Sequence, residues 1–107
     1  MIYKFKSKAD GDVIMTGPAG DDVLRTIGKS PAAKGIIECG AMGAAIAAIE
    51  NAVAADDAAR AAAEKEAAAS GAKLAPREGV SLRQRAWPLV EMMKRSIDEG
   101  ADIVWGV

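Results

Sequence analysis

Three arginines and a serine gather around the predicted start of the last helix. Ser81 stands three residues before Gln84, a capping-box pattern, so this helix should begin directly after Ser81. Free backbone N–H groups at a helix start attract anions, and guanidinium groups bind phosphate or carboxylate through paired hydrogen bonds. Arg83 and Arg85 point to different sides of a helix, so solvated surface charge is the competing interpretation. The candidate residues of an anion site are Arg77, Ser81, Arg83 and Arg85.

Cys39 is the single cysteine of the chain and stands between a predicted strand and a predicted helix. A thiol at a helix N-terminus ionises more readily and can then act as a nucleophile or redox sensor. Glu38 opposes ionisation of its neighbour, and no basic residue adjoins Cys39. Free cysteines often serve as small buried hydrophobic residues, and we favour this interpretation over a thiol-dependent enzyme.

The sequence contains no histidine, which removes the usual residues of several enzyme classes. Ser-His-Asp and Cys-His nucleophile pairs, histidine zinc sites and the common general base near neutral pH are all excluded. The segment 17–20, Gly-Pro-Ala-Gly, lacks the spacing of a phosphate loop and predicts a structural turn. We therefore expect no catalytic residue, no metal site and no cofactor, and we expect that the protein is not an enzyme.

Charge and composition exclude two further classes of partner. The formal net charge is −1, from 14 Lys and Arg against 15 Asp and Glu, whereas nucleic-acid binding usually needs a basic excess. No run of residues is long and apolar enough for a membrane span, and none resembles a signal peptide. One cysteine cannot form a disulfide within the chain. These features predict a cytoplasmic protein that binds neither nucleic acid nor membrane.

The first third of the chain predicts a hairpin, a short helix and a third strand. Residues 2–6 alternate, with Tyr3 and Phe5 on one face and two lysines on the other. Asp10-Gly11 is a strong hairpin signal before a second strand over 12–16. A short helix from Asp21 and a strand over 35–38 follow. The connection 16–35 is long enough for a crossover, so the second and third strands could be parallel.

An alanine-rich segment predicts one long helix over 41–69, where 16 of the 29 residues are alanine. Its first half carries an apolar stripe from Met42 to Val53, but its second half has only alanines and charges. At 1.5 Å per residue the helix would be about 43 Å long, against about 27 Å for the next helix. The excess predicts packing on another copy through a face of small residues. This face contains Ala55, Ala59, Ala62 and Ala63.

The last third predicts a helix over 82–99 and a strand over 102–107, which should pair with the first strand. Pro88 removes a backbone hydrogen bond, so we expect a kink or a restart there. Trp87 and Trp105 are expected in the core. The order ββαβααβ predicts one α+β domain over residues 1–107. Its architecture should be two layers, a small mixed sheet covered on one face by helices that include the long alanine-rich one.

Four blocks in order, GPAGDDVLRTIGK, PAAKGIIE, EGVSLRQRAWPLVEMMKR and ADIVWGV, follow the start MIYKFKSKA. Together they resemble a family of small bacterial proteins, mostly proteobacterial, catalogued as domain of unknown function 1840. Proline is common in that family where this chain has Cys39 and Gly43, which argues against a general role for the thiol. The resemblance covers nearly the whole chain and implies no activity or site.

The leading functional interpretation is a non-enzymatic binding or assembly protein that forms a homodimer. The alternative is a regulator that binds a small molecule or anion with Arg77, Arg83 and Arg85 at the capped helix start. A thiol-dependent enzyme at Cys39 is the third. The expected partner is therefore a second copy of the chain, with an unidentified protein or a small anionic ligand as the other options.

Overall fold

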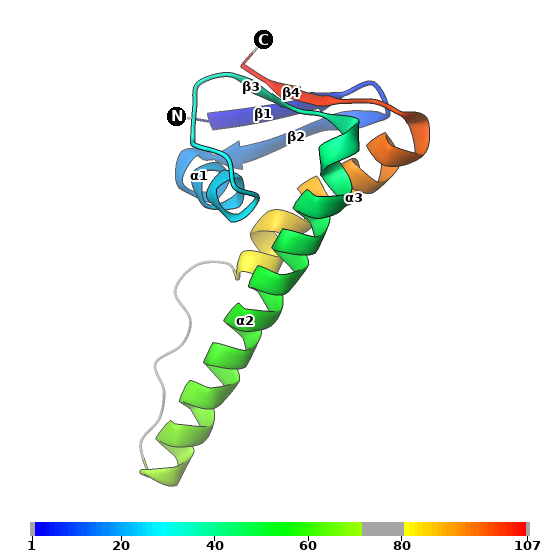
Figure 1. The fold of residues 1–107 in the computed structure, drawn as a ribbon. Helices are drawn as coiled ribbons and strands as arrows, with labels where there is room; N and C mark the ends of the chain where they lie inside the picture. Colours follow the sequence, from blue (N-terminus) through cyan, green and yellow to red (C-terminus); the bar gives the residue numbers. More distant parts are fainter. Residues whose placement is uncertain (1, 72–80, 107) are drawn as a thin grey trace.

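Four strands form one sheet in the computed structural model of the chain, which describes residues 2–71 and 81–106 (Figure 1). The α+β class and the predicted order ββαβααβ are confirmed. Helices lie on one face of the sheet and leave the other bare. The elements are β1 (Ile2–Ser7), β2 (Asp10–Thr16), α1 (Gly17–Thr26), β3 (Gly35–Ile37), the 3₁₀ turn η1 (Cys39–Ala41), α2 (Met42–Ala69), α3 (Leu82–Glu99) and β4 (Ile103–Trp105).

The strands lie in the order β2-β1-β4-β3, and every neighbouring pair is antiparallel. The predicted pairing of the first and last strands is confirmed, with Phe5 opposite Trp105 and Ser7 opposite Ile103. The prediction of a mixed sheet is wrong. Strand β3 reaches the sheet at the edge opposite β2 and pairs only with β4, so the crossover after β2 creates no parallel pair.

The core lies between the sheet and the helices. Tyr3 and Phe5 point inward with their rings stacked 5.8 Å apart, and Trp105 meets Phe5 edge-on at 5.6 Å. The prediction that Trp105 is buried is confirmed, and its indole donates to the carbonyl of Ala32 at 3.0 Å. The same prediction for Trp87 is wrong, because this residue falls on the solvent side of α3 and is 38% exposed.

The helix termini follow local signals in the sequence. Helix α1 begins at Gly17, earlier than predicted, because Pro18 is pre-organised for a first turn. Gly20 lies in this turn, where an added Cβ would be 2.0 Å from the Tyr3 ring, so only glycine allows this approach. Helix α3 continues through Pro88 without the restart considered above. The proline is exposed, so water can satisfy the carbonyl that its missing N–H leaves unpaired.

Helix α2 extends far beyond the core (Figure 1). Its last buried residue is Val53, although the helix continues to Ala69. The radius of gyration is 15.8 Å, where about 13 Å is typical of a compact chain of this length. We call residues 54–69 the arm; it is about 24 Å long at 1.5 Å per residue. The predicted lack of large apolar residues in this half explains why nothing in the described core covers it.

Candidate functional site

The capped start of α3 is formed as predicted. The Ser81 hydroxyl accepts from the Gln84 N–H at 3.2 Å, and the Gln84 side chain accepts from the Ser81 N–H at 3.1 Å. These two bonds complete the capping box. They use donors that a bound anion would need, because the Gln84 N–H is one of the free groups of the first turn. Arg77, the upstream member of the predicted anion site, lies outside the described residues.

The two arginines after the cap reach different helices. Arg83 donates to Asp57 of α2 at 2.7 Å, whereas Arg85 donates to Asp22 of α1 at 2.9 Å. Each guanidinium is matched by a carboxylate, and the Nε of Arg85 is buried with no hydrogen-bond partner among the described residues. Exposed ion pairs of this kind contribute about 0–1 kcal/mol each. In this arrangement both arginines link α3 to its neighbours and do not converge on a common ligand.

Cys39 begins the 3₁₀ turn that leads into α2. Its backbone N–H donates to Asp102 at 2.8 Å, and its half-buried thiol lies 3.8 Å from the carbonyl oxygen of Ser96. The first contact joins η1 to the turn between α3 and β4, and the second joins it to the end of α3. The arrangement favours the structural interpretation of the cysteine, because its thiol lies within hydrogen-bond distance of a carbonyl acceptor.

A pair of serines was not predicted from the sequence. Ser96 is fully buried, donates to the Met92 carbonyl at 2.7 Å and lies 2.8 Å from the hydroxyl of Ser7. The next residue, Ile97, is 40% exposed although it is apolar. The available signal was helical spacing, since Ser96 lies about 20° from Leu89 around the helix axis and Ile97 about 80°. In this pair each serine hydroxyl has a hydrogen-bond partner beside the sheet.

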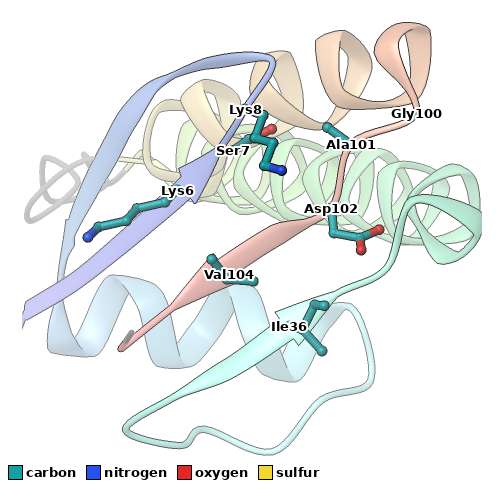
Figure 2. Close-up of a pocket in the computed structure, with 8 residues that line it drawn as sticks. All are labelled: Lys6, Ser7, Lys8, Ile36, Gly100, Ala101, Asp102 and Val104. Atoms are coloured by element: carbon teal, nitrogen blue, oxygen red, sulfur yellow. The ribbon is translucent and has the colours of Figure 1, made fainter.

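The bare face of the sheet contains a hollow of about 480 Å³ above β4 (Figure 2). Its floor is Val104, and Ile36 of β3 forms one side. Lys6 and Lys8 lie on the opposite side, and the turn that contains Asp102 closes one end. The sequence placed Lys6 on the wet face correctly. The hollow itself could not be predicted, because it depends on β4 lying between β1 and β3.

Tyr3 joins β1 to the first turns of α1. Its ring is buried and its hydroxyl donates to the Asp21 carboxylate. This hydrogen bond, followed by burial, raises the pKa of Tyr3 above its ordinary value of 10.0. The raised pKa means that folding favours the protonated phenol. Tyr3 is also the single tyrosine of the chain, so its titration can be followed without interference from another.

Absorbance titration of the native protein should give a tyrosine midpoint above pH 10. The unfolded phenol loses its proton near pH 10, while the folded one keeps it. The stabilisation is therefore complete below pH 10 and is lost as pH rises towards the folded pKa. Urea denaturation across this range should show the decline, and Asp21→Asn should move the midpoint back down. A wild-type midpoint at or below 10 would contradict the assignment.

The described residues contain no group of three or more histidine, cysteine, aspartate or glutamate side chains that could hold a metal ion. None of the helices within residues 2–71 and 81–106 has the length and hydropathy needed to cross a membrane. Comparison with known families gives one match, over residues 1–105, to a family described as a domain of unknown function (DUF1840). No curated protein and no solved structure matches the chain.

Proposed function

Because the chain belongs to the DUF1840 family, whose function is unknown, we base the proposal on the surface of the chain itself: we propose that it is a non-enzymatic assembly protein. The proposed assembly is a homodimer, and the arm of α2 is the proposed contact. The observation that carries this proposal is the helix itself, which continues for 16 residues beyond its last buried side chain at Val53.

Among residues 2–71 and 81–106, the part of the core that α2 contributes ends at Val53, and the arm lies beyond it. Most helical stability in proteins comes from packing of an apolar face and not from intrinsic propensity, so packing would stabilise the arm. The arm receives some help from the Arg60–Glu64 pair at 3.1 Å, but exposed pairs contribute only a few tenths of a kcal/mol. Packing on a second copy would bury alanine side chains and allow close approach of two backbones.

One face of the arm is available for that contact. Asp57 faces α3, because its carboxylate bonds to Arg83. Ala55 and Ala59 lie two residues to either side of Asp57, and at 100° per residue this places them on the opposite face of the helix. Both are exposed, as is Ala62, while Ala63 at the edge of this face is half-buried. These four residues are the small-residue face predicted from the sequence.

Light scattering at micromolar concentration should show a dimer for the wild type and a monomer for Ala55→Glu/Ala59→Glu. Glutamate would place bulk and like charge between two closely packed helices. The matched control is Ala54→Glu/Ala61→Glu, which makes the same charge change on the face of the arm nearer Asp57 and should remain dimeric. A monomeric wild type, or loss of the dimer in the control alone, would contradict the proposed contact.

The cytoplasm is the proposed location. This is supported by the free thiol of Cys39, because a reducing compartment preserves an unpaired cysteine. The near-neutral charge balance supports a partner other than nucleic acid. A fractionation experiment on the native cell, with the protein found outside the soluble cytoplasmic fraction, would overturn this part of the proposal.

A further inference from the structure

We draw no further inference here: the strongest candidate, the hollow of about 480 Å³ above Val104 on the bare face of the sheet, is a partly apolar surface, and nothing in the described part of the chain shows what covers it.

Discussion

A chain that lacks residues 103–107 should fail to fold cooperatively. Strand β4 joins the two halves of the sheet, because it pairs with β1 on one side and with β3 on the other. Its inward residues, Ile103 and Trp105, are 0% and 3% exposed. Loss of a buried isoleucine or tryptophan side chain costs about 2–5 kcal/mol each, and small domains have only about 5–15 kcal/mol of stability. Circular dichroism should show no sigmoidal melt.

Two point substitutions in the same strand separate side-chain packing from strand pairing. Trp105→Ala removes the contact with Phe5 and the hydrogen bond to Ala32, and should lower the free energy of unfolding by about 3–5 kcal/mol. Val104→Ala shortens the half-buried side chain that points outward between Ile103 and Trp105. It should lower the free energy of unfolding by about 1 kcal/mol or less. A truncated chain that melts near the wild-type temperature, or equal effects of the two substitutions, would contradict this account.

The alternation of apolar and polar residues was sufficient to predict this pairing. Tyr3 and Phe5 alternate with lysines, and Ile103 and Trp105 share one face of a strand. Each strand is therefore predicted to have an apolar face that must be buried. Local signals also predicted the long helix and the Ser81 cap. The arrangement of β3 could not be predicted in the same way, because a three-residue strand carries little pattern and its partner is decided by the rest of the sheet.

The candidate sites depend on long-range contacts, which local patterns do not contain. The partners of Arg83 and Arg85 lie 26 and 63 residues away in the sequence. No spacing rule connects these residues, so the sequence indicated clustered arginines where the structure places two separate ion pairs. The burial of Ser96 and the exposure of Trp87 likewise depend on the rotation of α3 about its own axis. An apolar stripe in the sequence determines which residues face the sheet only to within one or two positions.

Gly106→Ala should be among the most destabilising single substitutions. Gly106 has φ of +74°, and an added Cβ would be 2.1 Å from the Ala33 carbonyl oxygen and 2.7 Å from the Cα of Lys34. The left-handed conformation costs a residue with a Cβ about 1–2 kcal/mol. The backbone clash adds about 1–3 kcal/mol, because neither neighbour can rotate away as a side chain does.

Gly28→Ala is the matched control, because Gly28 has φ of +84° with no atom within 4 Å of the added Cβ. It should therefore show only the conformational cost of about 1–2 kcal/mol. Urea denaturation of both variants measures the difference, which is the cost of moving the segment before β3 away from the end of β4. Equal destabilisation by the two substitutions would show that this contact is not tight in solution.

The central position of β4 also constrains the order in which the chain can fold during synthesis. The β1–β2 hairpin is local in sequence and can form early, but the other edge of β1 can pair only after Trp105 has left the ribosome. Until then β3 has no strand beside it, and Phe5 lies at an open edge with Tyr3 next to it. A nascent chain therefore presents an aggregation-prone strand until residues 103–105 have been synthesised, and protection of that edge by a chaperone would matter more for the yield of folded protein than for its final stability.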